Sequence, residues 1–305
     1  MKKFMNKLVA LAMIMAGTAA QAQISQSLET ATGEYKGGST YSAMFREFTK
    51  ACPNLGMVER ETSGSGENID LLTGNKVKMA WVQSDMLFYT KMLDPNKVAN
   101  IRALFPLYDE ELHFISRAKQ KTVGKFSALG IGDKVELTNL SDLKGKTLGA
   151  VGGSIISANI VNAKTGLNMK VVTFQKNQDL LNALVENKVD AILVVGGAPH
   201  AIPKTLDSSF RLMAVNQEFL QPLSDVYTPT KISYSNMGQV GVSTVSTSAL
   251  AVTRVYSKKV SDQLKKVQDC FHNSIDDLKD ATGTHEKWQK IDPNAKVKWP
   301  MYEFK

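Results

Sequence analysis

Short apolar segments alternate with helical segments through most of the chain, and this alternation limits the possible folds more than any other feature. Alternating strands and helices indicate an α/β architecture, in which helices cover a sheet. The predicted strands cover residues 55–62, 77–83, 101–108, 112–117, 147–151, 170–174, 189–195 and 210–215. The predicted helices among them cover residues 41–51, 67–72, 155–165 and 177–186.

One helix–turn–strand unit occurs twice, in residues 69–82 and 181–194. Its turn is Gly74-Asn75-Lys76 in the first copy and Glu186-Asn187-Lys188 in the second. Two similar α/β lobes would give such a repeat, and so would a chance likeness of two units. A last helix is predicted by an apolar stripe with steps of three or four residues, formed by Val260, Leu264, Val267, Phe271, Ile275 and Leu278.

The first 22 residues have the pattern of a secretory signal peptide. Three lysines flank the start of the apolar stretch Leu8–Gly17, and Ala20-Gln21-Ala22 gives the small-x-small cleavage pattern. A membrane anchor would need about 18 or more apolar residues, and no later run reaches that length. We expect the mature protein to start near Gln23 and to be soluble in the periplasm.

The charge distribution argues against a nucleic-acid partner. The formal net charge is +8, from 37 basic and 29 acidic residues, but the lysines are scattered rather than gathered in a stripe. A mild positive field would attract an anion, although a solvated basic surface explains the charge as well. With 305 residues the chain is long enough for two domains.

The chain has only two cysteines, Cys52 and Cys270. In a secreted protein an even count is typical of a disulfide, while two buried free thiols are the alternative. Their spacing matches no metal site.

Four loops rich in glycine and hydroxyl residues lie at predicted strand-to-helix junctions: residues 37–41, 62–68, 152–157 and 196–200. Glycine lets a backbone approach a ligand closely, and the start of a helix favours an anion. Ligands of open α/β sheets bind beyond the carboxyl ends of the strands, where all four loops are predicted. Serine and glycine also cap helices and form turns, so one loop alone decides little. Four loops at matching positions favour a cleft.

The sequence contains no complete motif of the enzyme classes considered. Gly145-Lys146-Thr147 resembles the end of a P-loop, but Leu140 stands where the first glycine is required. No nucleophile elbow or dinucleotide fingerprint occurs. The acidic run Asp109-Glu110-Glu111 is interpreted as a solvated turn. The histidines show no metal-ligand spacing: His113, His200, His272 and His285. We therefore predict a binding protein without catalytic residues, cofactor or metal.

Taken in order, these loops resemble the TAXI family of solute-binding proteins, which serve tripartite ATP-independent periplasmic (TRAP) transporters. The most specific similarities are Thr62–Asn68, similar to a T-x-G-S-x-x-N loop, and Leu107–His113, similar to an L-Y-x-E-x-L-H segment. Further similar segments are residues 32–33, 38–41, 81–85, 142–146 and 189–191. The sequence differs from the family at residues 34–36, an insertion, and at the isoleucines of Gly152–Ser157.

The resemblance implies a type II periplasmic-binding fold, with two α/β lobes, two crossing strands and a cleft between them. Lobe one would comprise residues 23–116 and 250–305, and lobe two residues 117–249. The crossings would fall near residues 113–117 and 245–252. In this architecture the last helix returns to lobe one, so we expect a Cys52–Cys270 disulfide there.

The resemblance also implies a small anionic ligand, a glutamate-like amino acid or a dicarboxylate, delivered to a TRAP membrane permease by a monomeric protein. An ABC-type binding protein or a periplasmic sensor subunit of the same fold is the alternative. The expected ligand-binding residues are Ser39, Thr40, Tyr41, Ser65, Asn68, Gln83, Asp85, Ser154, Ser157, Gly197 and His200. Asp85 is the expected partner of a ligand ammonium group, and Ser65 the expected partner of an anion.

Overall fold

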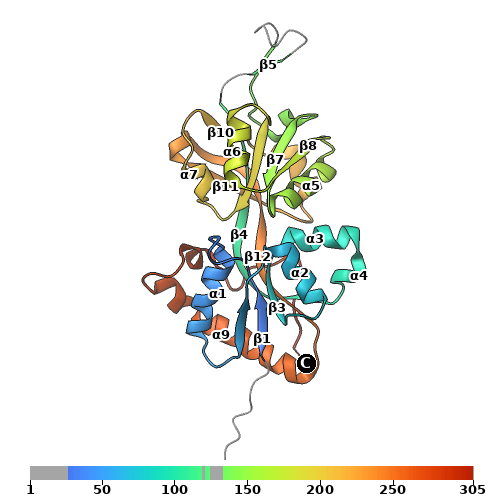
Figure 1. The fold of residues 1–305 in the computed structure, drawn as a ribbon, viewed down its shortest axis with the longest axis vertical. Helices are drawn as coiled ribbons and strands as arrows, with labels where there is room; N and C mark the ends of the chain where they lie inside the picture. Colours follow the sequence, from blue (N-terminus) through green and yellow to red (C-terminus); the bar gives the residue numbers. More distant parts are fainter. Residues whose placement is uncertain (1–26, 119–120, 124–132, 305) are drawn as a thin grey trace, which may run out of the picture.

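The computed structural model describes residues 27–118, 121–123 and 133–304 (Figure 1). The expected signal peptide, residues 1–22, and its cleavage site lie outside the described residues. The described chain folds into an upper and a lower α/β half, joined by strands that run through both (Figure 1). We call the half that holds β1 (Leu28–Ala31) the first lobe, and the half that holds β7 (Thr147–Val151) the second lobe.

Strands and helices alternate through both lobes, as the sequence predicted. The other strands are β2 (Met57–Arg60), β3 (Met79–Gln83), β4 (Ile101–Arg117), β5 (Lys121–Val123), β6 (Asp133–Val135), β8 (Lys170–Phe174), β9 (Ala191–Gly196), β10 (Phe210–Leu212), β11 (Thr228–Tyr234) and β12 (Gln239–Arg254). The α-helices are α1 (Thr40–Ala51), α2 (Ser65–Thr73), α3 (Ser84–Leu93), α4 (Pro95–Val98), α5 (Ser154–Thr165), α6 (Asn177–Val185), α7 (Ala201–Lys204), α8 (Gln217–Leu223) and α9 (Lys258–Asp280). Short 3₁₀ helices are η2 (Leu140–Leu143), η3 (Ser235–Met237) and η4 (Glu286–Lys290).

The main sheet passes through both lobes in the order β2-β1-β3-β12-β4-β9-β7-β8. Within each lobe the outer strands are parallel, with β1 between β2 and β3, and β7 between β8 and β9. The long strands β4 and β12 pair antiparallel with each other and run from one lobe to the other (Figure 1). The carboxyl ends of β3 and β9 therefore face each other where the lobes meet.

Helices cover both faces of the sheet in each lobe. In the first lobe α1 and α9 bury Phe48 and Phe271 on one face, while α2 and α3 bury Ile69 and Leu87 on the other. In the second lobe α5 and α6 cover opposite faces in the same way. The predicted stripe of the last helix is buried as expected, because its apolar positions share one face of α9.

The prediction of two strands, 101–108 and 112–117, joined by an acidic turn is wrong. The structure has one continuous strand of 17 residues, β4, and Asp109-Glu110-Glu111 lies in its middle. Alternation explains the difference, because Tyr108 and Glu110 point to one face while Asp109 and Glu111 point to the other. Polar residues within a strand here mark the point where β4 passes the cleft.

The repeated unit has the same geometry in both lobes. Asn75 and Asn187, each in the turn between a helix and a strand, have positive φ angles of 56° and 62°. Asparagine tolerates this left-handed conformation better than most residues. In each copy the following lysine, Lys76 or Lys188, donates its backbone N–H to a carbonyl of the preceding helix. The sequence repeat therefore corresponds to a structural repeat.

A disulfide joins Cys52, at the end of α1, to Cys270 on α9. The two residues lie 218 positions apart in sequence, and their Cα atoms lie 6.1 Å apart. Both helices pack on the same face of the first-lobe sheet. The bridge thus ties the start of the chain to its last helix within the first lobe.

Candidate functional site

A cavity of about 970 Å³ lies between the two lobes. Eight of the eleven residues predicted to bind a ligand line this cavity: Ser39, Thr40, Tyr41, Ser65, Gln83, Ser154, Gly197 and His200. All four glycine- and hydroxyl-rich loops contribute to its wall. The other three predicted residues are not among those that line it, and we describe them below.

The first residues of five α-helices line the cavity: Thr40 of α1, Ser65 of α2, Ser154 of α5, Asn177 of α6 and Ala201 of α7. The first turn of a helix has free backbone N–H groups and the positive end of the helix dipole. Helices from both lobes thus direct partial positive charge at one space. Such a space favours a carboxylate or another small anion.

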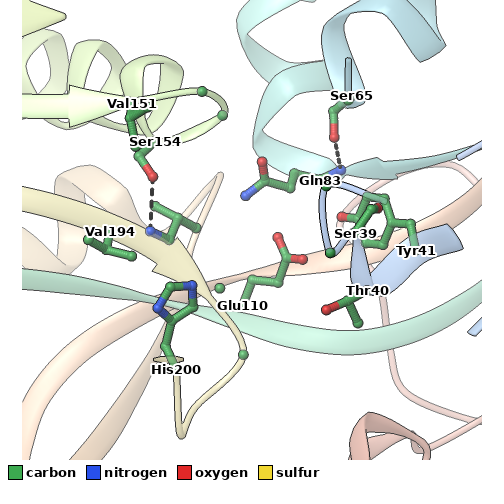
Figure 2. Close-up of a pocket in the computed structure, with 18 of the residues that line it drawn as sticks. Ser39, Thr40, Tyr41, Ser65, Gln83, Glu110, Val151, Ser154, Val194 and His200 are labelled. Atoms are coloured by element: carbon green, nitrogen blue, oxygen red, sulfur yellow. Dashed lines mark hydrogen bonds between the residues drawn. The ribbon is translucent and has the colours of Figure 1, made fainter. Parts of the chain in front are cut away.

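Two serines, one on each lobe, make matching hydrogen bonds beside the cavity. The Gln83 backbone N–H at the end of β3 donates to Ser65 Oγ at 3.0 Å, and the Val195 N–H of β9 donates to Ser154 Oγ at 3.0 Å. Each hydroxyl accepts one bond and keeps its own hydrogen to donate. The cap of α2 is Gly64, so Ser65 is not a side-chain cap of that helix. Figure 2 shows the two serines on opposite walls of the pocket.

Ser39, by contrast, is a helix cap. Its hydroxyl accepts the backbone N–H of Ser42 at 3.4 Å at the start of α1. Thr40 and Tyr41 follow it into the cavity wall. The Tyr41 hydroxyl is buried beside Glu110, and burial together with the charge of Glu110 raises the pKa of Tyr41.

Glu110 is the main functional candidate that the sequence interpretation missed. It is only 7% exposed, and its side chain rises from β4 into the pocket (Figure 2). Burial, together with the nearby charge of Asp85, raises the pKa of Glu110 to about 8. Hydrogen bonds from the side chains of Tyr108, Tyr41 and Gln83 favour the carboxylate and so lower this pKa, but they offset the increase only partly. The family-like segment Leu107–His113 contained the signal, because alternation within a single strand would have placed Glu110 inside.

Lys287 is a second missed residue. It belongs to η4, is 6% exposed, and lines the cavity next to the loop that carries His200. Burial lowers the pKa of Lys287, whereas burial and the charge of Lys287 lower the pKa of His200 to about 4. His200 is therefore neutral at physiological pH, while the Lys287 ammonium brings positive charge to the site.

A buried hydrogen-bond network supports the loop that carries Gly197 and His200. The Tyr234 hydroxyl accepts the His200 backbone N–H at 2.7 Å and lies 2.8 Å from Nε2 of His113. Nδ1 of His113 lies 3.2 Å from the carbonyl oxygen of Val194. Burial lowers the pKa of His113 to about 3, so the ring is neutral and acts as one donor and one acceptor. This network fixes the loop rather than contacting a ligand.

Asn68 was predicted to bind the ligand, but the structure places it away from the cavity. It lies on α2 and is fully buried, and its side-chain amide donates to the carbonyl oxygens of Thr32 and Trp81 at 2.6 and 2.7 Å. Thr62 donates its hydroxyl to the Asn68 side-chain oxygen. Since all of these groups are internal, Asn68 shapes the loop between β2 and α2.

Asp85 and Ser157, also predicted as ligand contacts, instead contact each other across the lobes. Oδ2 of Asp85, on α3 of the first lobe, accepts the Ser157 hydroxyl at 2.5 Å and the Tyr227 hydroxyl at 3.0 Å, both from the second lobe. Asp85 is 1% exposed, and burial raises its pKa while the two hydroxyl donors lower it. With its lone pairs used in this way, Asp85 is not the free partner for a ligand ammonium that we expected.

Two pocket glycines make room for the opposite lobe. A Cβ atom on Gly153 would lie 2.2 Å from the Gln83 side-chain oxygen, and one on Gly197 would lie 2.8 Å from Cε of Lys287. Real Cβ atoms do not approach other heavy atoms so closely. These glycines of the second lobe therefore allow close approach of first-lobe side chains.

Within the described residues, no cluster of three or more His, Cys, Asp or Glu side chains is arranged to hold a metal ion. No helix in the described part of the chain is long and apolar enough to cross a bilayer.

A mixed α/β fold with two lobes, two long crossing strands and an interlobe pocket defines the type II-like class of periplasmic solute-binding proteins. The model of the NMT1-like family matches residues 30–264, more than half of the chain. The chain belongs to the NMT1-like family. Among curated proteins, none matches the sequence.

Several solved structures are similar to this chain at low sequence identity. Protein AF1704 from Archaeoglobus fulgidus is 11% identical, with a TM-score of 0.51 over 88% of this chain and 84% of that one. The substrate-binding protein of an amino acid ABC transporter is 16% identical, with a TM-score of 0.48 over 83% and 94%. AbpA from Streptococcus pneumoniae, an amino acid ABC transporter substrate-binding protein bound to L-arginine, is 15% identical, with a TM-score of 0.48 over 87% and 95%. The similarity to AF1704 concerns the fold alone.

Proposed function

We propose that this protein is a periplasmic solute-binding protein that captures a small anionic metabolite, a glutamate-like amino acid or a dicarboxylate, for a membrane permease. The observation that carries the proposal is the interlobe cavity, into which helix starts from both lobes direct N–H groups and hydroxyl donors. These groups match a carboxylate, which accepts several hydrogen bonds and gains from helix dipoles.

Of the two ligand types, the buried acid Glu110 favours the amino acid. A ligand ammonium beside Glu110 would pair with its carboxylate, while the ligand carboxylate would lie near Ser65 and Ser154. A dicarboxylate has no cation to offer, so Glu110 would have to stay protonated beside it. Glu110 thus takes the role that we first assigned to Asp85.

The transport partner is proposed from the sequence resemblance. The segments similar to the TAXI family support a TRAP-type permease, while an ABC permease or a sensor is the alternative for the same fold. We further propose that residues 23–116 with 250–305 and residues 117–249 move as two bodies that close on the ligand, and that the protein acts as a monomer. If the protein serves transport, deletion of its own gene should abolish uptake of the ligand, whereas a sensor subunit would leave uptake unchanged.

The ligand is best found by a thermal-shift screen of amino acids and dicarboxylates, because a tight ligand at saturating concentration stabilises by several kcal/mol. The hit is then titrated by calorimetry against wild type, Glu110→Gln, and the control Glu218→Gln, an exposed acid on α8. We expect an amino acid as the hit and an affinity about ten- to a hundredfold weaker for Glu110→Gln only. A dicarboxylate whose affinity Glu110→Gln leaves unchanged would refute the role of Glu110.

Proton exchange gives an independent test of the ligand type. Because the pKa of Glu110 is about 8, the carboxyl is mostly protonated at pH 7. An ammonium ligand needs the carboxylate, so its binding at pH 7 should release close to one proton. Titrations in buffers with different ionisation enthalpies measure that number. Proton uptake on binding would contradict the amino acid proposal.

A further inference from the structure

The segment that follows α9 contains the pair Lys-Trp twice, as Lys287-Trp288 and Lys298-Trp299. In both pairs the tryptophan is buried, with 0% of Trp288 and 5% of Trp299 exposed. The two pairs lie on either side of the first-lobe sheet, since Trp288 packs with the core under α1 and α9 and Trp299 with the core under α2 and α3.

Both tryptophans are fixed to the first lobe. The indole N–H of Trp288 donates to Oε2 of Glu47 on α1 at 2.6 Å. The indole N–H of Trp299 donates to the carbonyl oxygen of Ile101 at 3.1 Å, and its ring packs edge-on against Phe88 of α3. The C-terminal segment is therefore anchored to the first lobe at two points.

Both lysines reach the second lobe. The Lys287 ammonium donates to the carbonyl oxygens of Gly197 and Ala198 at 2.8 and 3.1 Å. The Lys298 ammonium donates to those of Ser224 and Tyr227, each at 2.5 Å. Each lysine thus joins an anchored residue of the first lobe to two backbone carbonyls of a second-lobe loop.

The second lobe is shaped to receive Lys287. A Cβ atom at position 197 would lie 2.8 Å from Cε of Lys287 and 3.2 Å from the carbonyl oxygen of Asp109, so with any larger residue the lysine would have to move. The ammonium is almost fully buried, and a buried ammonium is unfavourable unless hydrogen bonds satisfy it. If the lobes separated, Lys287 would lose these two carbonyls and gain water. The four ammonium–carbonyl bonds therefore belong to the closed arrangement of the lobes.

We infer that Lys287 and Lys298 are positioning residues through which the C-terminal segment holds the second lobe closed against the first. The inference rests on the proposed function in one respect, that the lobes move apart to admit a solute. Lys287 is the stronger member of the pair because it is buried, whereas Lys298 is exposed.

The experiment measures the separation of the lobes directly. Spin labels are placed on Leu93→Cys in α3 and Val185→Cys in α6, two exposed positions on different lobes, and their distance is recorded by electron double resonance with and without the screened ligand. Lys287→Met should shift the distances to longer values, Lys298→Met less, and the double variant most. Ligand dissociation from Lys287→Met should be about tenfold faster.

Matched controls and a second variant keep the test decisive. Lys290→Met and Lys296→Met remove a charge from exposed positions of the same segment and should leave the distances unchanged. Gly197→Ala keeps the lysine but blocks its approach, so it should also lengthen the distances. Distances equal to wild type in Lys287→Met, Lys298→Met and Gly197→Ala would overturn the inference. A screen without any hit would count against the proposed function, while the ligand-free distances still decide whether the lysines hold the lobes.

Discussion

The two lobes have the same arrangement of strands but contribute different chemistry to the pocket. Among the described residues that line it, every charged side chain comes from the first lobe or its C-terminal segment: Glu67, Glu110, Glu286 and Lys287. The second lobe contributes Ile155, Ile156, Val194, backbone groups and a histidine whose low pKa keeps it neutral. The first lobe therefore holds the groups that can discriminate ligand charge, while the second provides a neutral wall.

This difference lies in side chains rather than in topology. Both lobes place a central strand, β1 or β7, between two parallel neighbours, and both use a left-handed asparagine to leave a helix for the strand beside the cleft. The fold thus makes two equivalent walls, and a few charged residues on α2, β4 and η4 make them unequal. We expect a ligand to bind the first lobe before the second closes on it.

The largest expected effect concerns the disulfide, which only the first lobe has among the described residues. Replacing Cys52 and Cys270 together by serine should lower the free energy of unfolding by about 5 kcal/mol in the chain-entropy model. Denaturant titration measures the loss, and hydrogen exchange should locate it mainly in α1 and α9. An equal loss of protection in β7 and β8 would contradict a first-lobe role of the bridge.

The pH dependence of stability should have opposite signs for Glu110 and for the buried histidines. Glu110 has a pKa of about 8 against a usual 4.5, so the native state binds its proton more tightly, and stability from Glu110 is lost as pH rises from about 4.5 to 8. His113 and His200 have lowered pKa values of about 3 and 4, so their contribution is lost as pH falls below 6.5. Each group changes stability by at most about 1.4 kcal/mol per pH unit.

Glu110→Gln is the variant that separates these contributions. It should remove the loss of stability that Glu110 causes as pH rises from about 4.5 to 8, and leave in place the loss that the histidines cause as pH falls. Denaturant midpoints across this pH range measure the slope. An unchanged slope above pH 6.5 would show that Glu110 is ionised in the native protein at neutral pH.

Substitution of one serine in each lobe tests the difference between the lobes at single residues. Ser65→Ala and Ser154→Ala each leave one backbone N–H without its acceptor, so each should lower stability by about 1 to 3 kcal/mol. If the first lobe binds the ligand first, Ser65→Ala should slow ligand association, whereas Ser154→Ala should mainly speed dissociation. Stopped-flow binding separates the two rates. Equal effects on both rates would remove the proposed order of binding.

The smallest expected effect is at the contact between Asp85 and the second lobe. Tyr227→Phe removes one of the two hydroxyl donors to Asp85 and should speed ligand dissociation about fivefold, equivalent to about 1 kcal/mol. Tyr256→Phe is the matched control, because its hydroxyl bonds only to Val77 of its own lobe. Faster dissociation in both variants would mean that Asp85 has no special part in closure.

Local pattern was enough to predict most of the fold. The predicted bounds of β7 and β8 match the structure, and the four helices predicted among the strands differ by at most two residues at each end, because periodicity and turn residues act over short distances. Helices α3, α4, α7 and α8 were not predicted. The loops that line the cavity followed in the same way, since the carboxyl ends of strands in an α/β sheet share one edge. These features depend on neighbours in sequence.

The site residues that could not be predicted from the sequence mostly depend on contacts between distant segments of the chain. Asp85 and Ser157 are polar residues in the first turns of helices, like Ser65. Unlike Ser65, they bond to each other across the two lobes and do not line the cavity. Lys287 comes from a segment without a motif, and only the tertiary fold brings it to Gly197. Glu110 was missed for another reason, because three successive acidic residues were taken as a turn when one of them alternates inward.

The position of β12 between β3 and β4 has a consequence for how the chain folds. The parallel strands of the second lobe, β7 to β9, come from one continuous stretch, so that lobe has them together early. The first lobe pairs β3 with residues 249–253, which are the last to join its sheet. Its sheet therefore stays divided during synthesis until nearly the whole chain has emerged, and the lobe that begins the sequence is completed last.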